Sequence, residues 1–200
     1  MIHRDDSMNG ILILATALLL APVPVVHAKT YLTRVQAEKI CFPKADRFEW
    51  KSHRYAPVQA MAIHKASGLM VIDPGIWYGV ALTKAGKVAG VLVFDRARGK
   101  HEFIDYVVAL TPEGQVRQVE ILEYRESWGD EVRRAGWRKQ FVNKDAQSKL
   151  ELHDGIHNIA GATISCRNVT DGVRRTCHAW HVVLRPALVT AGRLPKLASK

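Results

Sequence analysis

The amino-acid sequence predicts an α+β fold, in which an antiparallel meander sheet packs against helices and a long helix lies near the C-terminus. The prediction depends on two patterns. Between residues 76 and 124, apolar and β-branched runs are separated by turn signals, which is typical of consecutive antiparallel strands. After residue 163, apolar or small side chains recur at helical spacing over about five turns. This second pattern indicates a single long amphipathic helix.

The expected strands form two hairpins. One turn falls at residues 84–87, and the other at residues 112–114, where a proline suits the turn and a glycine supplies a positive φ. Along residues 103–111, apolar side chains alternate with other residues, as expected when one face of an antiparallel sheet is packed. The expected strands are 77–82, 88–94, 103–111 and 116–124.

The rest of the chain is divided around this sheet. Residues 32–42 are expected to form a short helix ended by Pro43, residues 130–142 a modest helix, and residues 143–158 a polar loop. We expect a signal peptide, an N-terminal extension packed on the main domain, the main α+β domain and a mobile basic tail. Their limits are residues 1–28, 29–75, 76–184 and 185–200.

The first 28 residues have the features of a secretory signal. Arg4 provides a positive charge, residues 11–26 are apolar and interrupted by two prolines, and residues 26–28 fit a cleavage site. The apolar run is shorter than the roughly 20 residues that span a bilayer, which favours cleavage over anchoring. Asp5 and Asp6 weaken the basic end, so an uncleaved, membrane-tethered form stays open. We therefore expect a periplasmic or other extracytoplasmic protein.

The chain is strongly basic, with a formal net charge of +10. Such a charge is typical of proteins that bind nucleic acid or anionic membranes. Export argues against nucleic acid as a partner, and the basic residues are scattered along the chain, so a solvated surface is the favoured interpretation. The alternative is electrostatic steering toward an acidic redox partner or contact with an anionic membrane surface.

The three cysteines do not define a disulfide framework. Cys166 and Cys177 lie on the predicted long helix about 16 Å apart, whereas a disulfide needs Cα atoms within roughly 7 Å. Cys41 has the option of a bridge to one of them in an oxidising compartment. The favoured interpretation is that Cys166 and Cys177 are buried as small apolar residues.

The segment before the long helix places a hydroxyl among very small residues. Gly161 adopts backbone conformations that are closed to other residues, and Ala162 leaves space beside it. Thr163 stands at or just before the helix start, where free N–H groups and the helix dipole favour an anion. A phosphoryl group at Thr163 would therefore be held electrostatically and sterically. The simpler alternative is that Thr163 or Ser165 is an N-cap.

Residues 161–173 resemble the attachment motif of the FMN-binding domain of the RnfG and NqrC flavoprotein subunits. In that family the threonine of a D-x-x-[ST]-G-A-T pattern is esterified to the phosphate of FMN, and Thr163 matches this threonine. His157 occupies the place of the Asp, and Ala160 that of the Ser or Thr. The resemblance implies cofactor-binding residues Gly161, Ala162, Thr163, Ile164 and Ser165.

Residues 123–132 are similar to a second segment of this family, H-x-E-T-P-G-L-G. Glu126 and Ser127 match its Glu and Thr, whereas Trp128 replaces its Pro. The two segments follow the family's order, and the resemblance covers about residues 76–184, with the long helix following the flavin-attachment loop. It implies that Glu126 and Ser127 belong to the flavin site. Trp128 or Tyr124 is a candidate for stacking on the flavin ring, with core packing as the alternative.

The resemblance implies an extracytoplasmic electron carrier with FMN as its cofactor. It would need a flavin transferase for maturation and membrane or periplasmic redox proteins as electron donor and acceptor. It implies no catalytic residue in the domain itself and no metal ligand. The two departures from the motif leave open an exported binding module of the same fold that binds FMN non-covalently or has lost it.

A metal-binding protein is the alternative from a different class. His153 and His157 are four residues apart, and His178 and His181 are three apart, so each pair has the spacing of one helix face. Gly155 lies within the first pair, in a segment expected to be a loop, and no fourth ligand is evident in the sequence. A specific metal site is therefore disfavoured.

Overall fold

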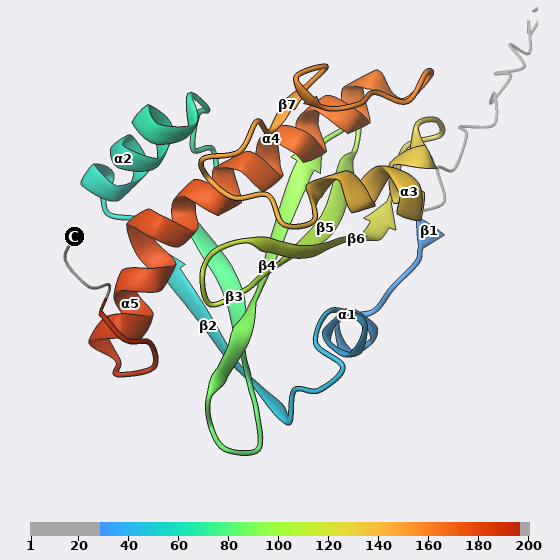
Figure 1. Cartoon of the computed structure of the whole chain (residues 1–200). Helices are drawn as coiled ribbons and strands as arrows, with labels where there is room; N and C mark the ends of the chain where they lie inside the picture. Colours follow the sequence, from blue (N-terminus) through green and yellow to red (C-terminus); the bar gives the residue numbers. More distant parts are fainter. Residues whose placement is uncertain (1–28, 197–200) are drawn as a thin grey trace, which may run out of the picture.

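The computed structural model describes residues 29–196, so the expected signal peptide lies outside the described part of the chain. A six-stranded antiparallel sheet with the order β1-β6-β5-β4-β3-β2 forms its centre (Figure 1). The four strands expected between residues 76 and 124 are its middle, which confirms the α+β class and the meander. The strands are β1 (Lys29–Thr30), β2 (Arg47–Arg54), β3 (Gly75–Leu82), β4 (Val88–Arg98), β5 (Phe103–Leu110) and β6 (Val116–Tyr124).

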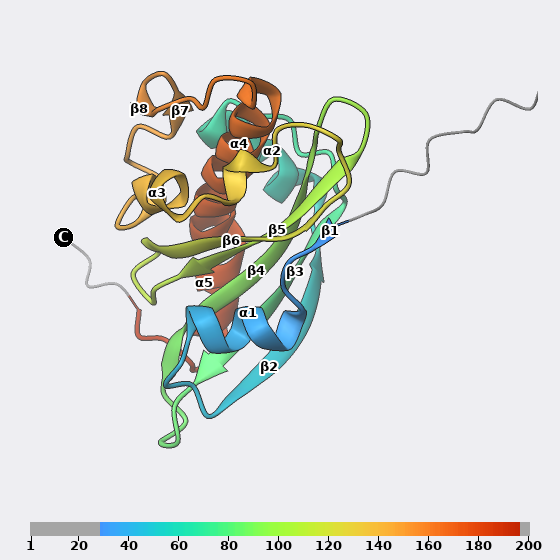
Figure 2. The ribbon, with the colours of Figure 1, turned by 90° about the vertical axis from the view of Figure 1, so that its right-hand side faces the viewer.

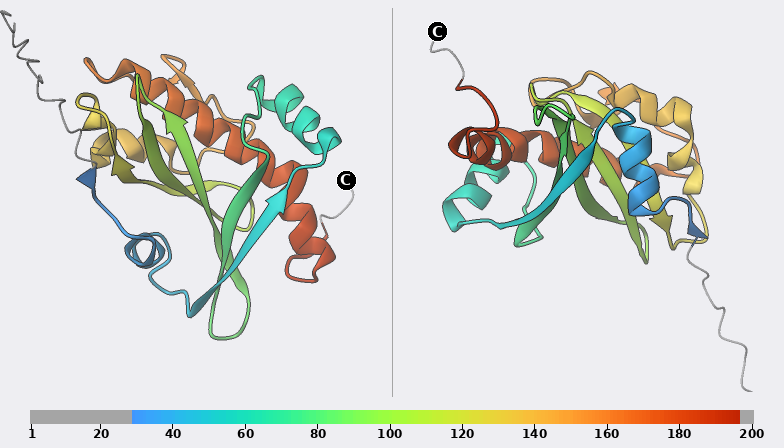
Figure 3. Two further views of the ribbon diagram at one scale, coloured as in Figure 1. Left: turned by 180° about the vertical axis from the view of Figure 1, so that it is seen from behind. Right: turned by 90° about the horizontal axis from the view of Figure 1, so that it is seen from below.

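The two faces of the sheet carry separate apolar clusters. Tyr78, Val93 and Tyr106 belong to the larger cluster, which packs against α4 (Thr163–Ala179) and α2 (Pro57–Ser67). The opposite face carries Leu92 and Val107, over which α1 (Arg34–Cys41) packs. Figures 2 and 3 show α1 and α4 on opposite sides of the strands. This division follows from the alternation of side chains along each strand.

The long helix begins at Thr163, as the helical spacing predicts. After Ala179 it continues through a π-helical turn, Trp180–Leu184, into α5 (Arg185–Thr190). A buried polar contact fixes α4 to the sheet, because Asp95 accepts hydrogen bonds from the Tyr106 hydroxyl at 2.6 Å and the Arg175 guanidinium at 3.1 Å. Burial raises the pKa of Asp95 above its ordinary value. Helix α4 is therefore held in a defined position over β4 and β5.

Residues 29–75, expected as an extension packed on the domain, contribute the two edge strands of the sheet and the helices α1 and α2. Strand β2 pairs along its whole length with β3, and β1 pairs with the end of β6. Thr33 caps α1 through a capping box with Gln36, and Gly68 ends α2 in the left-handed region. Strand pairing therefore continues across the domain boundary expected at residue 75.

Two further expectations need correction. Residues 130–142 form three short turns, because the backbone leaves helical geometry at Arg134. The turns are Asp130–Arg133, α3 (Ala135–Arg138) and Lys139–Phe141. The expected mobile tail begins as α5, where Leu188 is buried, and Arg193 pairs with Glu49 at 2.8 Å. The apolar side of residues 185–190 thus continues the core packing of the long helix.

The three cysteines are free and buried. Cys41 lies in the cluster under α1, whereas Cys166 and Cys177 lie on the other face of the sheet. The sheet separates them, so the option of a bridge from Cys41 is wrong. Among residues 29–196, none of the helices combines the length and the apolar character that crossing a bilayer requires.

Candidate functional site

A cavity of about 540 Å³ lies where the turn between β4 and β5, the segment after β6 and the start of α4 meet. All seven residues that the sequence predicts for the flavin site line it. They come from two segments that are distant in sequence, Glu126 and Ser127 on one side and residues 161–165 on the other. The remaining lining residues are Lys100, His101, Trp128 and Gly129.

The start of α4 has no group of its own that compensates its free N–H groups. Ala162 occupies the N-cap position without a side-chain hydrogen bond, and the first turn contains no acidic residue. The first helical bond runs from the N–H of Cys166 to the Ala162 carbonyl at 2.9 Å. The N–H groups of residues 163–165 therefore lie outside the helical ladder and, with the helix dipole, favour an anion. The N-cap interpretation of Thr163 and Ser165 is wrong, because both lie inside the helix.

The Thr163 hydroxyl is accessible and held by a neighbour. The residue is exposed, and its Oγ1 accepts a hydrogen bond from Nδ2 of Asn158 at 2.9 Å. The other amide atom, Oδ1 of Asn158, is buried without a partner among the described residues. If the amide were rotated by a half-turn, Oδ1 would accept the Thr163 proton instead. Asn158 therefore orients the hydroxyl and carries an acceptor for its proton.

The backbone before Asn158 is also held in place. Nε1 of Trp137 donates to the carbonyl of His157 at 2.8 Å, and the N–H of His157 donates to Gln140 at 2.8 Å. The His157 side chain is exposed. The residue that departs from the family's Asp therefore stands in a backbone segment held by Trp137 and Gln140.

A buried contact joins the two segments of the cavity. The hydroxyl of Tyr124 lies 2.9 Å from Oγ of Ser165 and donates to the carbonyl of Trp128. Gly129 passes beside this contact with φ +93°, and a Cβ there would lie 2.6 Å from the Tyr124 hydroxyl. Burial raises the pKa of Tyr124. Tyr124 is therefore a core residue, and of the two aromatic candidates only Trp128 is placed to stack on a ring.

The segment after β6 presents an exposed aromatic side chain to the cavity. Trp128 is 86% exposed although its neighbour Gly129 is buried. An indole that lines a cavity without covering by other side chains offers a free face for a planar ligand. Ser127 beside it is exposed as well and lines the same cavity.

Glu126 lines the cavity, but one of its oxygens is already engaged. Oε1 accepts hydrogen bonds from the N–H groups of His101 and Glu102, the latter at 2.9 Å. Burial alone would raise the pKa of Glu126, but these N–H groups outweigh it and hold the pKa below its ordinary value. The carboxylate thus fastens the turn between β4 and β5.

Lys100 and His101 also line the cavity, although neither sequence motif predicts them. They sit at the tip of a turn between two strands, where motif spacing gives no hint of what lies opposite. Only their basic character within residues 96–101 is visible in the sequence. Their place beside Thr163 is a result of the sheet bringing this turn to the start of α4.

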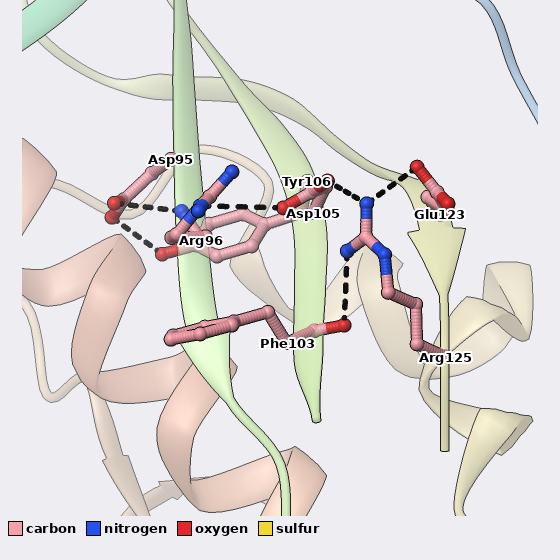
Figure 4. Close-up of polar contacts among 7 residues, drawn as sticks. All are labelled: Asp95, Arg96, Phe103, Asp105, Tyr106, Glu123 and Arg125. Atoms are coloured by element: carbon pink, nitrogen blue, oxygen red, sulfur yellow. Dashed lines mark hydrogen bonds and ion pairs between the residues drawn. The ribbon is translucent and has the colours of Figure 1, made fainter. Parts of the chain in front are cut away.

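A larger hollow of about 740 Å³ lies on the face of the sheet on which α1 packs, in the part that α1 does not cover. Trp77 and Phe94 line it, beside a row of charged side chains across β4, β5 and β6. In that row Arg96 faces Asp105, and Arg125 binds both Asp105 and Glu123 (Figure 4). No helix start and none of the predicted residues contribute to this hollow. Although this hollow is larger than the cavity at Thr163, none of its described lining residues would bind the phosphate of a flavin through a helix start.

Within residues 29–196, no group of three or more His, Cys, Asp or Glu side chains is placed to hold a metal ion. His153 has φ +72° and, like His157, lies outside the helices, so this pair does not share a helix face. Burial lowers the pKa of His178. Neither histidine pair therefore belongs to a group of three or more such side chains in this part of the chain.

Comparisons with known proteins agree with the geometry. Residues 99–178 match the family model of the FMN-binding domain. The chain is 30% identical over 105 residues to one component of the proton-translocating ferredoxin:NAD(+) oxidoreductase complex of Clostridium ljungdahlii, a match that covers 49% of this chain and 56% of the relative. The chain thus spans about half the length of this curated relative.

The fold is similar to a solved structure. The crystal structure of NqrC from Shewanella oneidensis superposes with a TM-score of 0.52 at 13% identity, over 76% of this chain and 88% of that one. Such a likeness at low identity concerns the fold. The family model and the sequence match indicate that residues 99–178 are similar to the FMN-binding domain of RnfG/NqrC-type subunits, which supports FMN as the cofactor.

The cavity fits this cofactor. Small-molecule sites have volumes of about 300–1,000 Å³, and the cavity lies within that range. The uncompensated start of α4 suits a phosphate, and the exposed indole of Trp128 suits a planar ring.

Proposed function

We propose that this protein is an extracytoplasmic electron-transfer flavoprotein whose FMN is linked by a phosphoester to Thr163. One observation supports the proposal above all. An exposed threonine hydroxyl lies at an uncapped helix start, on a cavity that also collects the second motif segment. The match to the FMN-binding domain supports FMN as the cofactor, and this geometry supports Thr163 as the place of attachment.

Each residue of the cavity has a separate role in binding FMN. The N–H groups of residues 163–165 hold the phosphate, while Gly161 and Ala162 leave space around it, since a Cβ at Gly161 would meet no atom within 4 Å. Asn158 orients the Thr163 hydroxyl by hydrogen bonding, and the proton released on esterification leaves to water or to the transferase. A flavin transferase supplies the activated flavin phosphate. Ser127 and Trp128 then face the ring and the ribityl chain.

Bound FMN accepts and releases electrons, and the protein supplies position and electrostatic surroundings. The domain then acts as a carrier between two redox partners without transforming a substrate. The relative in Clostridium ljungdahlii belongs to a ferredoxin:NAD(+) oxidoreductase complex, which supports membrane or periplasmic redox proteins as donor and acceptor. A covalent bond suits an exported carrier, because reversibly bound flavin is lost by dilution.

The domain limits belong to the same proposal. Residues 1–28 act as the export signal, residues 76–184 form the FMN-binding domain, and residues 29–75 complete its sheet. The basic surface, including residues 185–200, steers the carrier toward an acidic partner or an anionic membrane surface.

Co-expression with a flavin transferase tests the covalent link. The wild-type protein should show flavin fluorescence on a denaturing gel, Thr163→Ser should retain it because the hydroxyl remains, and Thr163→Val should be dark. Mass spectrometry of the peptide with residue 163 should show one FMN. A wild-type band that is dark although the native protein is yellow would contradict the phosphoester and favour non-covalent binding. A colourless native protein would favour a domain that has lost its cofactor.

A further inference from the structure

The turn between β4 and β5 brings basic side chains to the cavity that contains Thr163. Lys100 and His101 line this cavity, and Glu126 is its single acidic lining residue. Lysine offers a positive charge with three donors, and histidine offers ring N–H donors. A phosphate carries a charge of about −1.5 to −2 near neutral pH. These groups are therefore complementary in charge and hydrogen bonding to the phosphate end of FMN.

Hydrogen bonds from several elements hold the turn. Within it, the N–H of Gly99 donates to the carbonyl of Glu102 at 2.7 Å. From α4, Nδ2 of Asn168 donates to the carbonyl of Arg98. From the segment after β6, Glu126 accepts from two N–H groups of the turn. The tip is thus positioned by elements on either side of the cavity.

Arg125 braces the same turn at its other end. Its Nη1 donates to the carbonyl of Phe103 at 3.3 Å, while Nη2 binds Asp105 at 2.7 Å and Glu123 at 2.6 Å (Figure 4). A guanidinium held by two carboxylates has little freedom to move. Residues 125 and 126 therefore fix both the base and the tip of the turn.

We infer that Lys100 and His101 bind the phosphate of FMN, and that Glu126 is a positioning residue that holds them there instead of a ligand of the flavin. The inference rests on the proposed place of the phosphate at the start of α4. Oε1 of Glu126 serves the turn, so the carboxylate acts through the backbone of residues 101 and 102. The two N–H groups also offset its negative charge next to the phosphate.

Riboflavin provides the test, because it has the ring and ribityl chain of FMN and lacks only the phosphate. The protein is produced without a flavin transferase, so that binding is reversible, and dissociation constants are measured by fluorescence titration. Lys100→Ala with His101→Ala should weaken FMN binding by at least about tenfold. Riboflavin binding should change by less than about twofold, and the preference for FMN should fall with added salt.

Lys84→Ala is the matched control. It removes the same charge from the turn at the opposite end of β4, where residue 84 is exposed and outside the cavity. It should leave both affinities unchanged. An unaltered preference for FMN in the double variant, or equal losses for FMN and riboflavin, would overturn the inference.

Two substitutions of Glu126 separate positioning from direct contact. Glu126→Gln keeps an oxygen that accepts from the turn, so it should retain the preference for FMN over riboflavin. Glu126→Ala removes the acceptor and should reduce that preference as the double variant of Lys100 and His101 does. A direct contact of Glu126 with the ring or ribityl chain would instead weaken both flavins alike in the alanine variant. Circular dichroism shows whether each variant folds. If Glu126→Ala does not fold, the double variant of Lys100 and His101 still tests the inference.

Failure of the inference differs from failure of the proposed function. If the wild type binds both flavins and the double variant keeps the FMN preference, only the inference fails. If the wild type binds neither flavin and stays dark with the transferase, the proposed function fails, and this inference with it.

Discussion

Tyr124 and Ser165 meet hydroxyl to hydroxyl at 2.9 Å, although 41 positions separate them in the sequence. Tyr124 is the last residue of β6, and Ser165 lies in the first turn of α4. The contact therefore joins the ends of the two segments that line the proposed flavin site. Both residues are buried, so loss of one hydroxyl leaves the other without this partner.

Tyr124→Phe should destabilise the fold by about 1–3 kcal/mol, because it leaves the buried groups of Ser165 and Trp128 without their partner. Urea unfolding measures the loss. Tyr78→Phe is the control, since Tyr78 is buried in the same core and its hydroxyl makes no hydrogen bond with the described residues. Equal losses in the two variants would show that the contact at Ser165 contributes nothing of its own.

Gly129→Ala should cost more than about 1 kcal/mol of unfolding free energy. Its φ of +93° is unfavourable for alanine, and the new Cβ would lie 2.6 Å from the Tyr124 hydroxyl and 2.9 Å from Oγ of Ser165. Gly136→Ala is the matched control, because a Cβ at that position meets no atom within 4 Å and the residue is helical. It should leave stability unchanged or raise it by about 0.5–1 kcal/mol. Comparable destabilisation by both would contradict the close approach at Gly129.

Trp128→Ala should weaken FMN and riboflavin equally, by about two- to tenfold, because stacking involves the ring that both share. Trp128→Phe should retain most of the affinity. Phe103→Ala serves as the control, since Phe103 is another exposed aromatic residue near the turn but does not line the cavity. Fluorescence titration gives the constants. A loss confined to FMN would argue against stacking at Trp128.

The thiols should be unreactive in the folded protein. Burial raises the pKa of Cys41 and of Cys177 to about 12, and it also raises the pKa of Cys166. An aromatic disulfide reagent at pH 8 should therefore label none of them within minutes and should label all three in guanidinium. Electrophoresis with and without a reductant should give the same mobility. A thiol titre below three after denaturation under non-reducing conditions would show that a disulfide had formed.

Much of the fold could be predicted because its elements carry strong local patterns. The strand runs with turns at residues 84–87 and 112–114, and the spacing after Thr163, are local signals. Strand β2 has no such signal, since it lies at the edge of the sheet and alternates polar with aromatic residues. The sequence predicts one helix for residues 130–142, but the backbone at Arg134 leaves helical geometry and divides the segment.

For the site, the sequence supplied both motif segments and seven of the eleven residues that line the cavity. It did not predict Lys100 and His101, because no local sequence pattern indicates that their turn lies opposite the start of a helix. It also left the role of Tyr124 open between stacking and core packing. That choice depends on a hydrogen bond to Ser165, which only the packing of α4 on β6 creates.

By itself the sequence determined the order of the four central strands and the long helix, the hydroxyl at residue 163 and its place at a helix start, since these depend on neighbours within a few turns of the chain. Only the tertiary structure decided which groups gather around that hydroxyl. The uncapped N–H groups, the engaged carboxylate of Glu126 and the exposed indole of Trp128 meet at one cavity because the sheet register and the packing of α4 bring distant segments together. Such contacts depend on burial and long-range pairing, and no local pattern encodes them.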